Sequence, residues 1–232
     1  MARALEAVHA RRLEEHAAEL AEHFAHSSDP ADLTKAVEYA ELAARRAMSV
    51  FAYGEAVRHW GQALKAQDVL DPDDKVKRCD LLLAQGEAML PLEEPGKIAV
   101  SVATEAFALA EAIDDSLRAA RATLVALEAL LRADGTNRGR ASPVFQSWTA
   151  RADQYAEVGT AERVYADIYC GLAQLGLSKP TAAHPFMRRA VHRALELDDD
   201  ALVFAAASWA LRHLAALHDR ELLARLDMRN RV

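Results

Sequence analysis

Histidine supplies the one set of side chains in this 232-residue sequence whose spacing suggests a metal site. His9, His16 and His23 recur every seven residues, and His26 follows three residues later. On one continuous helix, seven residues is two turns, or roughly 10 Å, which is too far for two ligands of the same ion. His23 and His26 with a nearby glutamate have the right reach. A metal-dependent enzyme that uses His16, His23 and His26 is therefore one hypothesis, although a polar helix edge covering a neighbouring hairpin or domain is the favoured interpretation.

Other chemistry is sparse. The only Gly-Lys pair, Gly96-Lys97, lacks the upstream glycine of a phosphate-binding loop, and no nucleophile-elbow or dinucleotide-binding pattern occurs. Cys79 and Cys170 lie far apart in apolar contexts, which predicts buried, reduced thiols rather than a disulfide or a metal site. We therefore expect no catalytic residue, no cofactor and no enzyme activity.

Charged segments have ordinary explanations. The acidic runs 71–74 and 198–200 each precede an expected helix, where carboxylates cap free N–H groups. The loop 132–140 contains Arg138 and Arg140 and could accept a phosphate, but a solvated loop is favoured. The net charge of −7 argues against direct nucleic-acid binding. No stretch reaches 18 uncharged apolar residues and no signal peptide is evident, so we expect a cytoplasmic protein without a membrane span.

The elements that carry these residues are expected to be helices. The sequence has 51 alanines but only 16 glycines and prolines together, which favours an all-α protein. Proline, aspartate and serine mark helix starts clearly enough to predict ten or eleven helices. The expected helices cover about 3–26, 30–50, 53–67, 74–89, 97–113 and 116–133, with further starts near 143, 160, 180, 200 and 219.

Small residues recur at a fixed period in two interleaved series. Spacings of 42, 43 and 42 residues separate Ala44, Gly86, Ala129 and Gly171, while spacings of 47, 42 and 42 separate Ala63, Ala110, Ala152 and Ala194. Small residues let helix backbones approach closely, and Trp60, Phe107, Thr149 and Val191 hold the positions that would fill the space between units. Two series with one period predict a repeated helical hairpin.

One unit resembles the tetratricopeptide repeat. The resemblance rests on Ala44 in the first helix and on Ala56, Trp60 and Ala63 in the second, within Tyr53-Gly-Glu-Ala56-Val-Arg-His-Trp60-Gly-Gln-Ala63-Leu64. The period of that family is shorter, so the helices here should be longer. The resemblance implies an all-α, right-handed superhelical solenoid of about five tetratricopeptide-like hairpins.

The first third of the chain resembles the segment that follows the nucleotide-binding core of large bacterial signal-transduction ATPases, among them transcriptional regulators and adenylate/guanylate cyclases. The resemblance rests on four segments: Arg12 to Phe24, Asp29-Pro30, Lys35 to Ala40 and Ala52 to Ala56. It implies that the chain is a single repeat domain cut from a longer protein. Residues 1–28 would link it to a missing ATPase domain, and residues 29–232 would form the hairpins.

In such an array the first helices of the hairpins line a concave groove. The resemblance places in it Glu38, Glu41, Arg45, Met48, Asp80, Leu83, Glu87 and Thr123, followed by Ala126 and Leu130. This acidic N-terminal end would suit a basic or mixed peptide, and solvated faces or a covering domain remain alternatives. We expect a non-catalytic sensor that binds a peptide, a partner domain or a small ligand and regulates the ATPase; the rival hypothesis is an oligomerisation scaffold, such as a homodimer, without a ligand.

Overall fold

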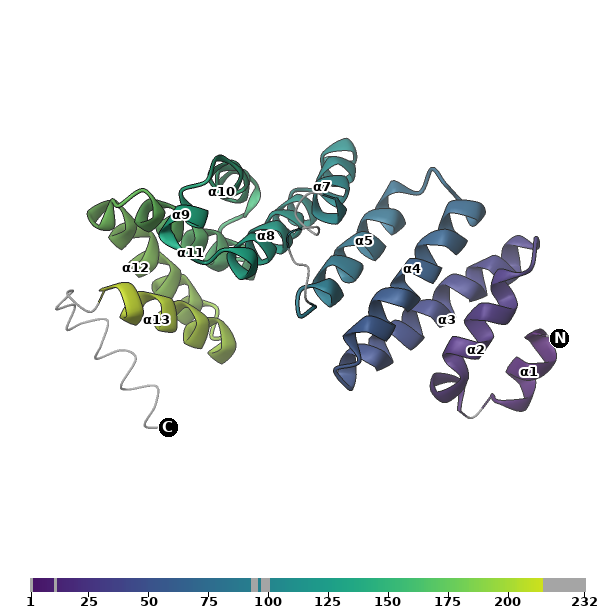
Figure 1. Cartoon of the computed structure of the whole chain (residues 1–232). Helices are drawn as coiled ribbons and strands as arrows, with labels where there is room; N and C mark the ends of the chain where they lie inside the picture. The colour runs from purple at the N-terminus through teal and green to yellow at the C-terminus, as the bar shows by residue number, and fades with distance from the viewer. Residues whose placement is uncertain (1, 11, 93–95, 97–100, 215–232) are drawn as a thin grey trace.

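Helices account for nearly all of the described chain. The computed structural model describes residues 2–10, 12–92, 96 and 101–214, and within these it has twelve helices (Figure 1). Their bounds are α1 (Ala2–Val8), α2 (Leu13–Ala25), α3 (Pro30–Ser49), α4 (Tyr53–Leu70), α5 (Lys75–Met89), α7 (Val102–Ala112), α8 (Ser116–Ala133), α9 (Asn137–Arg140), α10 (Pro143–Tyr155), α11 (Ala161–Gly176), α12 (Pro180–Glu196) and α13 (Asp200–Leu214).

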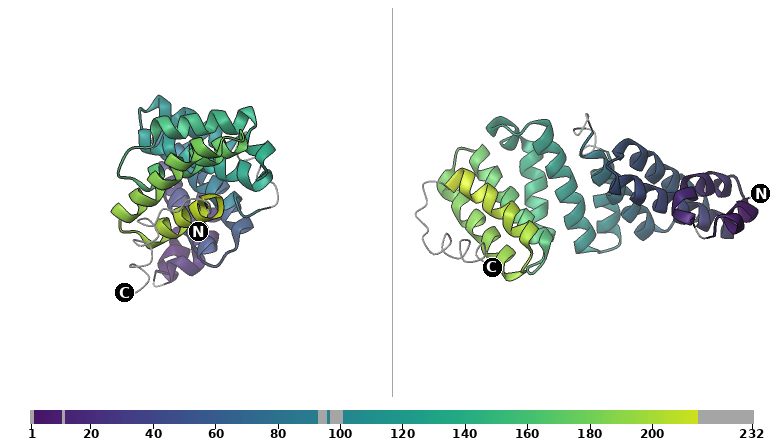
Figure 2. Two further views of the ribbon diagram at one scale, coloured as in Figure 1. Left: turned by 90° about the vertical axis from the view of Figure 1, so that its left-hand side faces the viewer. Right: turned by 90° about the horizontal axis from the view of Figure 1, so that it is seen from below.

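The helices pack as consecutive pairs along one direction of the molecule. Helix α3 packs on α4, α5 on α7, α8 on α10 and α11 on α12, and each pair also contacts the next (Figure 2). Contacts between alternate helices join α5 to α8, α8 to α11 and α11 to α13. These four helices therefore form one layer of the stack. The all-α solenoid predicted from the repeat is confirmed.

The small residues of the repeat lie where the period predicts. Ala44, Gly86, Ala129 and Gly171 are buried on α3, α5, α8 and α11, and the second series of alanines is buried on α4, α7, α10 and α12. A Cβ atom at Gly171 would lie 2.6 Å from the Cε atom of Met187 on α12. A side chain at this position would therefore displace Met187, and the glycine lets the two helices of the hairpin approach closely.

Aromatic rings fill the space between hairpins, but one of them does so from an unexpected position. Trp60 and Phe107 are buried as predicted. In the following unit Trp148 takes this role, because its ring packs edge-on against Phe107 with centroids 5.6 Å apart. Thr149, which the period selects, is buried too but uses its hydroxyl to donate to the Phe145 carbonyl at 2.8 Å.

Helix starts follow the predicted capping pattern. Asp29 accepts from the Ala31 N–H ahead of Pro30, and Asp74 accepts from the Lys77 N–H. Asp199 accepts from the first N–H groups of α13. The two acidic runs thus cap helices, as expected, by satisfying N–H groups that have no partner within the helix.

The predicted first helix, 3–26, is wrong: it is broken into α1 and α2. Contacts with α3 explain the break. Glu6 of α1 accepts from the Tyr39 hydroxyl at 2.6 Å and from Lys35 Nζ at 2.5 Å, and Arg3 pairs with Asp29 at 2.8 Å. These bonds require the chain to turn back toward α3.

Two other segments differ from the prediction or lie outside the described residues. The loop expected at 134–140 contains the short helix α9, whose start is capped by Thr136 through its hydroxyl and the Gly139 N–H at 3.3 Å. The start of the helix expected at 97 and the helix expected from 219 lie outside the described residues.

Candidate binding groove

A groove of about 510 Å³ lies along the layer formed by α5, α8 and α11. Its walls come from three successive hairpins, so its shape depends on their stacking. The lining residues are Glu87, Leu90, Arg121, Leu124, Val125, Glu128, Arg132, Ala161, Glu162, Tyr165 and Tyr169.

Charged pairs connect the walls of this groove. Arg121 of α8 donates to Glu87 of α5 with an Nη2–Oε1 distance of 2.8 Å. Glu128 of α8 accepts from Arg132 Nε at 2.8 Å and from the Tyr169 hydroxyl of α11 at 2.6 Å. Burial and the neighbouring Glu128 raise the pKa of Tyr169 well above its usual value, so the hydroxyl keeps its proton and remains a donor. These five polar side chains of the groove are therefore held in fixed positions.

A second polar link sets the distance between α5 and α8 just beyond the groove. Arg118 donates to both carboxylate oxygens of Asp80, from Nε and Nη2, at 2.8 Å each. Its Nη1 atom also donates to Asp115 at 2.5 Å. Bidentate arginine pairs fix geometry as well as adding energy. The Asp80 carboxylate therefore has a structural role, which is to join α5 to α8.

Of the residues predicted from the sequence, Glu87 lines the groove. Glu41 and Arg45 pair with each other at 3.1 Å on α3, and Glu41 also pairs with Lys77 of α5. Glu38 is exposed and Met48 half-buried on the same helix, away from the lining residues.

The prediction that Leu83 and Thr123 line the groove is wrong, because both side chains are buried, with 1% and 0% exposure. Thr123 donates its hydroxyl to the Ala120 carbonyl at 2.6 Å, and Ala126 is also buried. On α8, the face carried over from the tetratricopeptide pattern therefore points toward the core. On α8 the groove is lined instead from Arg121, Leu124, Val125, Glu128 and Arg132.

The residues of α11 that line the groove were not predicted from the sequence. Tyr165 and Tyr169 are four residues apart, the spacing that places two side chains on one helix face. Glu162 precedes Tyr165 by three residues and extends the same face. This periodicity was a usable signal, but the repeat motif weakens in this part of the chain.

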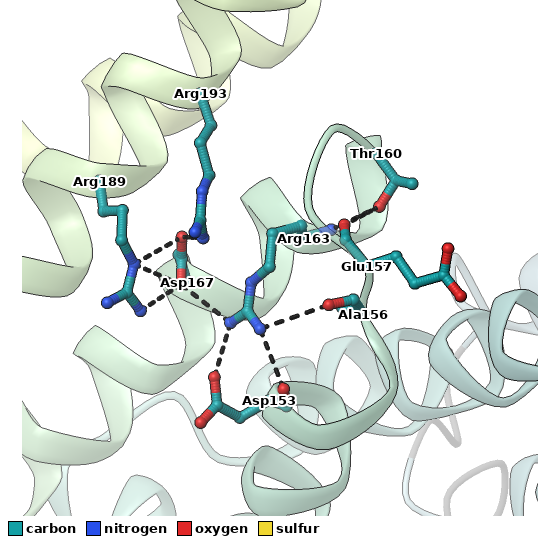
Figure 3. Close-up of polar contacts among 8 residues, drawn as sticks. All are labelled: Asp153, Ala156, Glu157, Thr160, Arg163, Asp167, Arg189 and Arg193. Atoms are coloured by element: carbon teal, nitrogen blue, oxygen red, sulfur yellow. Dashed lines mark hydrogen bonds and ion pairs between the residues drawn. The ribbon is translucent and has the colours of Figure 1, made fainter.

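A buried carboxylate anchors α11 to α12 (Figure 3). Asp167 has no exposed surface and accepts from Arg163 at 2.8 Å and from Arg189 at 2.6 Å. Arg193 completes the cluster, and Arg163 also donates to Asp153 at 2.8 Å. None of these residues lines the groove, so the role of the cluster is to stabilise the packing of α11 on α12.

The histidines do not converge. His16 Nδ1 lies 3.4 Å from Glu19 and His23 Nε2 lies 4.0 Å from the same side chain, while His26 is exposed. The expected separation of His9 and His16 is wrong, since the break between α1 and α2 stacks their rings with centroids 3.5 Å apart. Within the described ranges, no group of three or more His, Cys, Asp or Glu could hold a metal ion.

Among the described residues, no helix combines the length and the apolar character needed to cross a bilayer.

Comparison with solved structures finds chains of similar fold. The structure described as a Rap protein complexed with Competence and Sporulation Factor superposes on this chain with a TM-score of 0.54 at 11% sequence identity. The two folds are similar. The alignment covers 84% of this chain and 60% of the Rap protein, and at this identity the likeness concerns the fold alone. No protein-family model matches the sequence, and the comparison with curated proteins finds no match.

Proposed function

We propose that this chain is a non-catalytic binding module whose groove between α5, α8 and α11 takes a peptide or a segment of a partner protein. The observation that carries the proposal is the 510 Å³ groove, in which apolar side chains from three hairpins lie beside charged pairs. The Rap protein of similar fold was solved in complex with Competence and Sporulation Factor, which supports a binding role for this architecture.

The lining indicates what the partner segment contains. Leu90, Leu124 and Tyr165 offer apolar and aromatic surface, which anchors side chains such as Leu, Phe or Met. Three glutamates and two arginines surround this surface, so the lining carries one net negative charge. A segment with apolar anchors and a small excess of basic residues therefore complements the groove.

Regulation of an ATPase is the second part of the proposal. It rests on the resemblance of residues 12–56 to the segment that follows the nucleotide-binding core in bacterial signal-transduction ATPases. Binding in the groove would alter the stacking of the hairpins and so the contact with such a domain. This requires that the partner bind one conformation more tightly than another.

The test is a selection of displayed random peptides on the purified protein, with Leu124→Glu as the groove variant. Leu124 lines the groove, whereas Leu117 lies on the same helix, is 52% exposed and is not part of the lining. Leu117→Glu is therefore the matched control. We expect selected peptides to bind the wild type and L117E equally and to lose at least tenfold in affinity for L124E. Peptides that bind all three proteins equally would contradict the proposal.

Sedimentation velocity separates peptide binding from the scaffold hypothesis. A groove open to peptide predicts that wild type and L124E have the same sedimentation coefficient. A wild-type dimer that L124E converts to a monomer would show that a second copy of the chain covers the groove, and would overturn the peptide-binding proposal.

A further inference from the structure

A cluster of two arginines and a histidine lies between α9 and α13, outside the groove. Its members are Arg140 at the end of α9 and Arg212 and His213 in the last turn of α13. Arg140 is 9% exposed, and its Nε atom has no hydrogen-bond partner. The Nε2 atom of His213 is also buried without a partner.

The backbone of Arg140 is held rigidly. Gln146 Nε2 donates to the Arg140 carbonyl at 2.8 Å and to the Ala173 carbonyl of α11 at 3.2 Å. Gly176, in the last turn of α11, packs so closely that a Cβ atom there would lie 2.7 Å from the carbonyl carbon of Arg140. Helix α9 therefore packs closely against the end of α11, which fixes the backbone position of Arg140.

The Trp209 ring contacts all three side chains. The Cζ atoms of Arg140 and Arg212 lie 5.9 and 5.1 Å from its ring centroid, and the His213 ring stacks on it at 5.8 Å. Arginine above an indole face is a favourable arrangement, and it leaves the N–H edge of the guanidinium available. The two guanidinium groups and the imidazole are thus brought together around one ring.

No carboxylate balances this charge among the residues that the structure describes: the ion pairs found there include neither Arg140 nor Arg212. Burial and the neighbouring Arg212 lower the pKa of Arg140, and burial, Arg140 and Arg212 lower that of His213. A buried cation without a counter-charge is costly. Elsewhere on this chain the buried arginine, Arg163, does have carboxylate partners.

We propose that Arg140, Arg212 and His213 form a binding site for a phosphate group, either as free phosphate or as a phosphorylated side chain of a partner. Two guanidinium groups and an imidazole N–H match the tetrahedral oxygens of phosphate as charge-assisted donors. Arg212 is exposed, so the site is open to solvent on that side. The site lies outside the groove lining, and the proposal does not depend on groove binding.

Thermal unfolding in sodium phosphate, with sodium chloride keeping the ionic strength constant, tests the site. We expect the wild-type melting temperature to rise with phosphate concentration, and Arg140→Met to remove the rise. Without phosphate R140M should be at least as stable as the wild type, because an unpaired buried charge is gone. Arg58→Met is the control, since Arg58 is an exposed arginine paired with Glu55 at 2.7 Å. It should keep the full phosphate response.

Calorimetric titration separates the two sources of phosphate. Inorganic phosphate and a phosphoserine peptide are the probes, with the unphosphorylated peptide as the control. Binding of inorganic phosphate indicates a free ligand, whereas binding of the phosphopeptide alone indicates a group on a partner. In either case Arg212→Gln, an exposed substitution, should weaken binding at least tenfold. Binding of neither probe, or equal binding by R140M, overturns the proposal.

Discussion

The guanidinium of Arg189 on α12 donates from Nη2 to the fully buried carboxylate of Asp167 on α11 at 2.6 Å. Arg163 and Arg193 donate to the same carboxylate (Figure 3). One buried acid thus holds three arginines of a single hairpin in place. The hairpin formed by α11 and α12 depends on this acid because it offsets the charge of side chains that α11 and α12 bring together.

Asp167→Asn should destabilise the protein strongly. The substitution keeps the shape of the side chain but removes the charge that balances Arg163, Arg189 and Arg193. Removing one partner of a buried ion pair costs about 3–5 kcal/mol when the other charge is left without compensation, and we expect the lower end, about 3 kcal/mol, because Arg163 keeps its pair with Asp153 and Arg189 is 42% exposed. The free energy of unfolding from urea titration measures the loss. Glu55→Gln, which breaks an exposed pair with Arg58, is the control and should change stability little; equal effects of the two variants would contradict the role given to Asp167.

Gly176→Ala tests how closely α9 packs against α11. The new Cβ atom would lie 2.7 Å from the backbone nitrogen of Ala141 and from the carbonyl carbon of Arg140, so α9 must move. We expect a loss of about 1–3 kcal/mol in the free energy of unfolding, the usual cost of overpacking. Gly54→Ala is the control, since no atom lies within 4 Å of its Cβ position, and a helical alanine should be neutral or stabilising there. An unchanged free energy of unfolding in G176A would show that α9 does not pack tightly against α11.

Much of the fold was predictable because it depends on local and periodic signals. The positions of Ala44, Gly86, Ala129 and Gly171 follow from a spacing that close helix packing enforces, and the helix starts at Asp29 and Asp74 follow from unsatisfied N–H groups. The break after α1 was not predictable in this way. It results from Glu6 reaching Tyr39, 33 residues away, and no local pattern encodes that contact.

The candidate site was predictable only in part. Glu87 lines the groove, but Leu83, one turn earlier on α5, is buried in the core, and Thr123 on α8 is turned away from the groove. The rotation of each helix depends on how its neighbours pack, and one residue of offset moves a side chain by about 100°. The phosphate site combines residues 72 and 73 positions apart in the sequence, Arg140 with Arg212 and His213, so spacing alone could not reveal it.

Metal binding at the histidines of the first two helices should be absent. The His9 and His16 rings are stacked with planes 24° apart, so their nitrogens do not converge on one point. We expect equimolar zinc to leave the melting temperature of the wild type and of His16→Ala unchanged. A rise in the wild type that H16A removes would instead restore the metal hypothesis, because a ligand that binds the folded state stabilises it.

The two buried cysteines should make the protein less stable at alkaline pH. Burial, with a smaller contribution from nearby aspartates, raises the pKa of Cys79 to about 11 and that of Cys170 to about 12. An unfolded thiol has a pKa of about 8.5, so between these values the unfolded chain releases protons that the folded chain retains. Stability is therefore full below about pH 8.5 and falls as the pH rises, by about 1.4 kcal/mol for each thiol at pH 9.5. Urea titrations at pH 7.5 and 9.5 measure the loss in the wild type and in the double variant Cys79→Ala/Cys170→Ala. Because each protein is compared with itself, the cavity left by alanine cancels, and an equal loss in both proteins would show that the thiols do not contribute.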